Sequence, residues 1–188
     1  MCAAKLVVGL TGMPGAGKSV VVNVARGRNY GVVVMGDEVR EEARRRGLEP
    51  TPENIGHIML ELRRLEGEAS IAKRCIPKIL GEGKEKIIVD GVRSLAEVEE
   101  FRKNFKCFVL VAVHSSPETR FKRLFHRRRS DDPEDWEIFR ERDLRELSVG
   151  LGCAIAMAEY MIVNEGDLEA AKREAERVLE RVEKKWMR

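Results

Sequence analysis

Eight consecutive residues near the N-terminus have the types and the spacing of a phosphate-binding loop. The stretch Gly12-Met13-Pro14-Gly15-Ala16-Gly17-Lys18-Ser19 matches the pattern G-x-x-x-x-G-K-[ST] at every fixed position. Its glycines allow backbone N–H groups to turn toward a phosphate without Cβ clashes. The Lys18 ammonium can then reach the β- and γ-phosphates, while the Ser19 hydroxyl ligates Mg²⁺. The alternative is a glycine-rich turn that binds nothing, but the complete pattern favours a nucleoside triphosphate.

The segments on either side of the loop have the character that this chemistry requires. Residues 6–10 are an apolar run of the buried-strand type, and residues 20–28 are compatible with a helix. A helix that begins near Lys18 adds the positive end of its dipole at the phosphates. The predicted nucleotide-binding residues are Gly12, Met13, Pro14, Gly15, Ala16, Gly17, Lys18, Ser19 and Val20.

Asp90 follows another apolar run, residues 87–89, which we expect to be a strand. An acid at this position can hold the magnesium shell together with Ser19, directly or through water. The alternative is an Asp that caps the following helix. Because the chain also carries a P-loop, we favour the magnesium site, formed by Ser19 and Asp90.

Asp37 and Arg40 follow a third apolar run, residues 32–35. The Asp37 carboxylate can orient an acceptor hydroxyl or accept its proton, and Arg40, one turn later, can bind an acceptor phosphate. Arg93 is a further candidate for the acceptor. An N-terminal cap followed by a solvated arginine explains Asp37 and Arg40 equally well, so both interpretations stay open.

Several arginines follow the fourth predicted strand, residues 107–113. The run 127–129 lies on a polar turn, where it can neutralise charge that develops on a transferred phosphoryl group. A run of arginines is also typical of a solvated surface. Arg123, Arg140 and Arg142 on the adjoining helical segments are further candidates.

Apolar strands alternate with helices along the whole chain, and the fifth predicted strand is residues 160–163. This alternation predicts an α/β fold with a parallel sheet covered on both faces. The stretch from 37 to about 81 contains no convincing strand and reads as a helical insertion. Ligands bind such sheets at the C-terminal ends of the strands, where the P-loop, Asp37, Asp90 and Asn164 are all expected.

Composition limits the partners. The chain has 188 residues, of which 36% are charged, yet the net charge is +3 and the pI is about 8.7. This balance suits a polyanionic small molecule and argues against nucleic acid as the ligand. No apolar run approaches the roughly 20 residues of a membrane span, and the four cysteines show no C-x-x-C spacing. We expect a cytoplasmic protein.

Several stretches together resemble the P-loop nucleoside-monophosphate-kinase-like family, which includes adenylate kinase and dephospho-CoA kinase. The resemblance is closest to the archaeal adenylate-kinase-related proteins of the UPF0200 type and covers nearly the whole chain. The stretches that carry it are residues 12–19, 35–40, 89–94, 127–133, 139–143 and 162–164.

The family resemblance implies a P-loop NTPase three-layer sandwich with five parallel strands, formed as a single domain over residues 1–188. Its core would comprise 1–36, 83–125 and 134–188, with a helical acceptor-binding insertion at 37–82 and a short lid at 126–133.

The same resemblance implies roles for individual residues. Gly36, Asp37 and Arg40 match the acceptor-side motif of adenylate kinases, and Asp90, Gly91 and Arg93 resemble their D-G-x-P-R stretch, with Val92 in place of proline. Arg127 and Arg129 resemble lid arginines, Arg140 or Arg142 the arginine after the lid, and Asn164 an asparagine near the adenine. The lid lacks a zinc-binding cysteine set, and the acceptor region has no adenine-specific motif.

The resulting hypothesis is ATP- and Mg²⁺-dependent phosphoryl transfer to a nucleotide or nucleotide-like acceptor, a nucleoside monophosphate or dephospho-CoA, by a monomer or homodimer. The predicted catalytic residues are Lys18, Asp37, Arg127, Arg129 and Arg142. The alternative is a P-loop ATPase, acting as a nucleotide-dependent regulator or RNA-processing accessory protein without a small acceptor. No N-K-x-D guanine motif is present.

Overall fold

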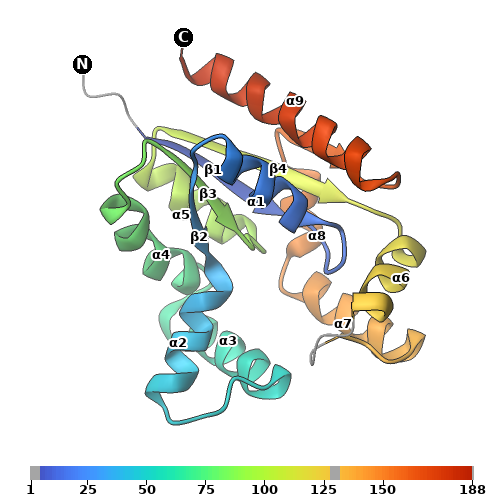
Figure 1. The fold of residues 1–188 in the computed structure, drawn as a ribbon. Helices are drawn as coiled ribbons and strands as arrows, with labels where there is room; N and C mark the ends of the chain where they lie inside the picture. Colours follow the sequence, from blue (N-terminus) through green and yellow to red (C-terminus); the bar gives the residue numbers. More distant parts are fainter. Residues whose placement is uncertain (1–4, 128–131, 188) are drawn as a thin grey trace.

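A computed structural model describes residues 5–127 and 132–187, in which five parallel strands form one sheet (Figure 1). The strand order is β2-β3-β1-β4-β5, with β1 in the centre. The strands are β1 Leu6–Thr11, β2 Gly31–Val34, β3 Lys86–Asp90, β4 Cys107–His114 and β5 Tyr160–Val163. The predicted α/β architecture is therefore confirmed.

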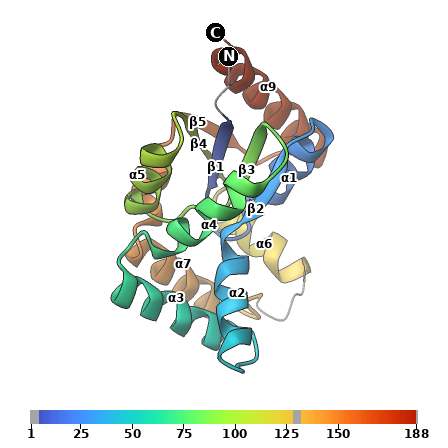
Figure 2. The ribbon, with the colours of Figure 1, turned by 90° about the vertical axis from the view of Figure 1, so that its left-hand side faces the viewer.

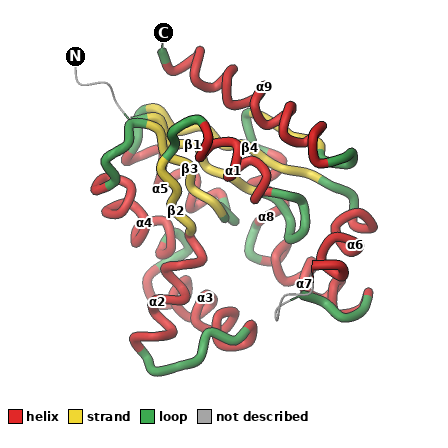
Figure 3. Tube along the Cα trace, viewed as in Figure 1, coloured by secondary structure: helices red, strands yellow, loops and turns green. Residues whose placement is uncertain are grey.

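Helices cover both faces of the sheet (Figures 1 and 3). α1 (Lys18–Gly27) and α9 (Leu168–Trp186) pack on one face, and α4 (Ser70–Gly81), α5 (Leu95–Asn104) and α8 (Leu151–Ala156) lie on the other. Every residue of β1 is buried, because alternate side chains of this central strand enter the two cores. Leu6, Val8 and Leu10 contact the α1–α9 side, and Val7 contacts the α4–α5 side.

Two helical pairs project beyond the C-terminal ends of the strands (Figure 2). α2 (Met35–Arg45) and α3 (Pro52–Glu66) follow β2, while α6 (Pro117–Arg127) and α7 (Trp136–Ser148) follow β4. Residues 128–131 of the predicted lid lie outside the described residues. Among the described residues, no helix is both long and apolar enough to cross a bilayer.

The connections that leave β1 and β3 run to opposite faces of the sheet. β1 leads through the glycine loop to α1, whereas β3, its neighbour in the sheet, leads to α5. Where two adjacent strands diverge in this way, a crevice opens at their C-terminal ends. The P-loop and Asp90 meet there, since Leu10 pairs with Asp90 in the β1–β3 register.

Two local predictions differ from the structure. The second strand was predicted over residues 32–35, but it ends at Val34, and helix α2 already begins at Met35, so Gly36, Asp37 and Arg40 lie in its first turns. Helix α8 was not predicted. It is only six residues long, and its burial of Leu151 and Ala154 depends on neighbours that are distant in the sequence.

Candidate functional site

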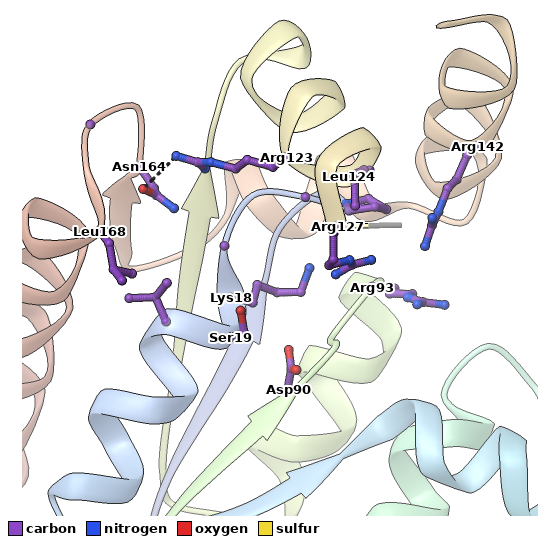
Figure 4. Close-up of a pocket in the computed structure, with 16 residues that line it drawn as sticks. Lys18, Ser19, Asp90, Arg93, Arg123, Leu124, Arg127, Arg142, Asn164 and Leu168 are labelled. Carbon is purple, nitrogen blue, oxygen red and sulfur yellow. Dashed lines mark hydrogen bonds between the residues drawn. The ribbon is translucent and has the colours of Figure 1, made fainter. Parts of the chain in front are cut away.

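A pocket of about 500 Å³ occupies the crevice (Figure 4). Its walls come from the P-loop and α1, the end of β3, helices α6 and α7, and the segment from β5 into α9. The polar and charged side chains that line it are Lys18, Ser19, Asp90, Arg93, Arg123, Arg127, Arg142 and Asn164. At the end formed by β5 and α9 the lining becomes smaller and more apolar, with Gly166, Leu168 and Ala171.

The P-loop backbone has the conformation that its glycines permit. Gly15 and Gly17 have φ values of 81° and 98°, in the left-handed region that side chains disfavour. A Cβ on Gly12 would overlap the carbonyl oxygen of Val113. The loop therefore depends on glycine both for its turn and for its close approach to β4.

Lys18 is half-buried at the centre of the pocket's charges. Its ammonium donates to the carbonyl oxygen of Gly12 at 2.6 Å. Burial lowers the pKa of Lys18, an effect opposed by the carboxylates of Asp90 and Glu146 and reinforced by Arg93 and Arg142. When a nucleotide binds, a phosphate oxygen can replace the Gly12 carbonyl oxygen as the acceptor for the Lys18 ammonium. The phosphate would also supply negative charge beside this ammonium.

Asp90 and Ser19 offer oxygen atoms suited to a hard cation. The Oδ1 atom of Asp90 is buried and has no hydrogen-bond partner among the described residues. Burial raises the pKa of Asp90, while the positive charges of Lys18 and Arg93 oppose that rise. No group of three or more His, Cys, Asp or Glu side chains in the described chain could hold a metal alone. This donor set fits Mg²⁺, which takes one or two protein ligands together with phosphate oxygens and water.

Arg93 connects the pocket to two helices. Its Nη1 donates to the sulfur of Met59 on α3 at 3.1 Å, and its Nε lies 3.4 Å from Oε2 of Glu146 on α7. Its backbone N–H donates to Glu97 at 2.7 Å, and the fully buried Glu97 also accepts from Arg63 of α3. These contacts place the guanidinium where α3 and α7 both reach the pocket.

Asp37 and Arg40 lie at the start of α2, outside the lining of the pocket. The Nη2 atom of Arg40 is 2.8 Å from Oδ1 of Asp37, and the two side chains are 43% and 53% exposed. Asp37 contributes to the raised pKa of Asp90, so the two carboxylates lie within electrostatic reach of each other. A Cβ at Gly36 would lie 3.2 Å from the Arg40 guanidinium. Of the residues predicted to bind the acceptor, only Arg93 lines the pocket.

Arg127 and Arg142 reach the pocket from α6 and α7. Arg127 pairs with Asp132, whose Oδ1 is 2.5 Å from its Nη2, and Arg142 lies 4.0 Å from the same oxygen. Arg140 is exposed and does not line the pocket. Arg129 lies outside the described residues.

Sequence reasoning missed several residues that support the site. Arg120 donates to the P-loop carbonyl oxygen of Pro14, the Ser115 hydroxyl lies 3.2 Å from that of Ala16, Glu146 pairs with Arg93, and Leu168 and Ala171 line the far end of the pocket. Leu168 has the helical spacing of the buried face of α9, but at the start of the helix it is 57% exposed. None of these residues belongs to a contiguous motif, so no local signal identifies them.

Comparison with known proteins agrees with this geometry. A family model described as an AAA domain matches residues 11–140. A UPF0200 protein of Hyperthermus butylicus is 52% identical over 95% of this chain and 95% of its own, and one of Methanocaldococcus jannaschii is 48% identical over 94% and 90%.

Similar solved structures include a shikimate kinase from Acinetobacter baumannii in complex with shikimate, with a TM-score of 0.60, 16% identity and coverage of 97% and 96% of the two chains. A gluconokinase from Sinorhizobium meliloti 1021 has a TM-score of 0.57 at 16% identity, with coverage of 95% and 93%. At this identity the likeness concerns the fold.

Proposed function

The chain belongs to the UPF0200 family and has a P-loop kinase-like fold, and from this premise we propose an ATP- and Mg²⁺-dependent phosphotransferase that acts on a nucleotide or nucleotide-like acceptor. One observation carries the proposal. Lys18, Asp90, Arg93 and Arg142 come from four different segments of the chain and line one pocket within electrostatic reach of one another.

The donor triphosphate occupies the P-loop end of the pocket. Backbone N–H groups of the loop and the Lys18 ammonium bind its β- and γ-phosphates. Ser19 and Asp90 would hold Mg²⁺, which would neutralise negative charge on the triphosphate. The nucleoside extends toward Gly166, Leu168 and Ala171, which line the end of the pocket formed by β5 and α9.

The acceptor lies on the other side of the transferred phosphoryl group, near Arg93. The Arg93 guanidinium is fixed between α3 and α7 by Met59 and Glu146, and a guanidinium is suited to an acceptor phosphate. If the attacking atom is a hydroxyl oxygen, Asp37 accepts its proton. The new O–P bond forms as the bond from the γ-phosphorus to the bridging oxygen breaks.

Arg127 and Arg142 supply positive charge to the transferred group from α6 and α7. Phosphoryl transfer depends mainly on positioning and on neutralising the charge of the equatorial oxygens. Binding of a triphosphate does not require Arg93. Its presence in the pocket therefore favours transfer to an acceptor over simple hydrolysis of ATP.

The test is turnover of ATP by the purified protein with Mg²⁺, alone and with each nucleoside monophosphate or dephospho-CoA. A phosphorylated acceptor formed in equal amount with ADP supports the proposal and identifies the acceptor. Release of ADP and free phosphate at one rate, whatever is added, would instead indicate an ATPase. Lys18→Ala, which removes the phosphate-binding ammonium, is the control and should show no turnover.

A further inference from the structure

The amide of Asn164 is occupied at both ends by other parts of the protein. Its Nδ2 donates to the carbonyl oxygen of Ala16 in the P-loop at 2.9 Å, and its Oδ1 accepts from Nη2 of Arg123 at 3.2 Å. The reversed amide would place an oxygen against a carbonyl and an NH₂ against a guanidinium, so chemistry determines its orientation. Asn164 is only 5% exposed.

Ser115 lies at the centre of the same group but cannot replace Asn164. Its hydroxyl oxygen lies 2.5 Å from the carbonyl oxygen of Asn164 and 3.2 Å from that of Ala16, and it accepts from Arg123 at 2.9 Å. A hydroxyl has one proton, and the shorter contact to Asn164 takes it. The Asn164 amide is therefore the main donor to the Ala16 carbonyl.

This hydrogen bond determines the direction of a P-loop N–H group. In a planar trans peptide the C=O and the next N–H point in opposite directions. Because the Ala16 carbonyl is held toward Asn164, the N–H of Gly17 is directed to the other side of the loop. A Cβ on Gly17 would overlap the Asn164 amide nitrogen, which shows that Asn164 packs directly against this peptide.

We propose that Asn164 is a positioning residue for the phosphate cradle and does not recognise the base of the nucleotide. The inference rests on the proposed function in taking a nucleoside triphosphate as the ligand. Asn164, with Ser115 and Arg123, holds the Ala16–Gly17 peptide in the orientation that phosphate binding needs. It acts equally on every ligand that carries a polyphosphate, whatever base is attached.

Inorganic tripolyphosphate separates this role from base recognition, because it has phosphates and no base. We would measure the binding of ATP, GTP and tripolyphosphate with Mg²⁺ by calorimetry, for the wild-type protein and for Asn164→Leu. The Leu side chain has nearly the same shape and adds no charge near the phosphates, but it lacks the donor to Ala16, while Arg123 keeps its hydrogen bond to Ser115. We expect the affinity for all three ligands to fall by the same factor, about tenfold, for the loss of one buried hydrogen bond.

Two measurements separate positioning from a loss of folding. The melting temperature of Asn164→Leu should stay well above the assay temperature. In ¹⁵N–¹H spectra, the downfield shift of the Gly17 amide on addition of tripolyphosphate should shrink in the variant. Asn104→Leu is the matched control, since exposed Asn104 hydrogen-bonds to Glu100 on its own helix, and it should leave all three affinities unchanged.

Weaker binding of ATP with unchanged binding of tripolyphosphate would overturn the proposal and assign Asn164 to the base. Unchanged binding of all three ligands would also overturn it. These measurements need no acceptor, so a failure to find phosphoryl transfer would count against the proposed function and leave the role of Asn164 standing.

Discussion

Arg120 on α6 and Asp143 on α7 form a two-point ion pair inside the protein. Nη1 of Arg120 donates to Oδ1 of Asp143 at 2.8 Å, and its Nη2 donates to Oδ2 at 2.5 Å. The guanidinium also donates to the carbonyl oxygens of Pro14 and Ser115, each at 3.2 Å, and lies over the ring of Phe139. Arg120 thus joins the P-loop to the helix that carries Arg142.

Arg120→Lys should therefore lower both activity and stability. A lysine keeps the positive charge, but it cannot form the two parallel hydrogen bonds to Asp143 together with the contact to Pro14, so both the ion pair and the link to the P-loop weaken. We expect turnover to fall at least tenfold and the melting temperature to drop. Arg140→Lys, on the exposed side of α7, should change neither quantity, and equal effects of the two substitutions would contradict the role of Arg120.

Asp37→Asn should separate nucleotide binding from transfer. The residue lies outside the lining of the P-loop pocket, so we expect the ATP affinity measured by calorimetry to be unchanged. Transfer to a hydroxyl acceptor should fall by about 10²–10⁴-fold, the range for loss of a general base. Glu41→Gln is a matched control, because Glu41 is on the same helix and pairs with Lys78. Full transfer activity of Asp37→Asn would remove Asp37 from the mechanism.

Removal of the metal should weaken nucleotide binding through Asp90. With excess EDTA, we expect the wild-type protein to bind ATP at least tenfold more weakly than with Mg²⁺. Asp90→Asn lacks the charged oxygen that we assign to the metal, so its ATP affinity should respond much less to Mg²⁺. An equal response of the variant and the wild type would show that Asp90 does not hold the metal.

Glu183 provides a test of stability against pH, away from the site. Burial alone would raise the pKa of Glu183, but hydrogen bonds from Arg28 and Lys86 lower it below its ordinary value. A carboxyl group with a lowered pKa in the folded state stabilises the fold above its unfolded pKa of 4.5, and this contribution disappears as the pH falls through the folded pKa.

Glu183→Gln should therefore destabilise the protein near neutral pH, by about 1–3 kcal/mol, the range for hydrogen bonds to charged groups. The difference from the wild type should diminish below about pH 4.5, as urea unfolding at several pH values would show. If the difference in unfolding free energy between the variant and the wild type does not change with pH, the charge of Glu183 does not contribute to stability.

Patterns that are local in the sequence predicted the parts of the fold that local forces form. The P-loop is contiguous, and its glycines act through their own backbone angles, so its conformation could be predicted from residues 12–19 alone. Apolar runs of three to seven residues predicted the strands, because strands buried on both faces need apolar side chains throughout. The cap of α5 is also local, because Ser94 accepts the N–H of Glu97 three residues later, in the capping-box spacing.

Tertiary structure decided which distant residues meet at the site. Asn164 and Ala16 are separated by 148 positions and Arg120 and Asp143 by 23, yet each pair is hydrogen-bonded. The sequence places Asn164 at the end of a predicted strand, but no pattern in it indicates that the Asn164 amide hydrogen-bonds to the P-loop. Likewise, Asp37 and Arg93 were predicted together, whereas only Arg93 lines the pocket.

The physical reason is that a motif depends on backbone geometry over a few residues, while a site depends on how rigid elements pack. By itself, the sequence determined a P-loop, a parallel sheet and the edge of that sheet where ligands bind. The packing of α6, α7 and β5 against the loop decided which side chains face the phosphates and which hold the loop in place.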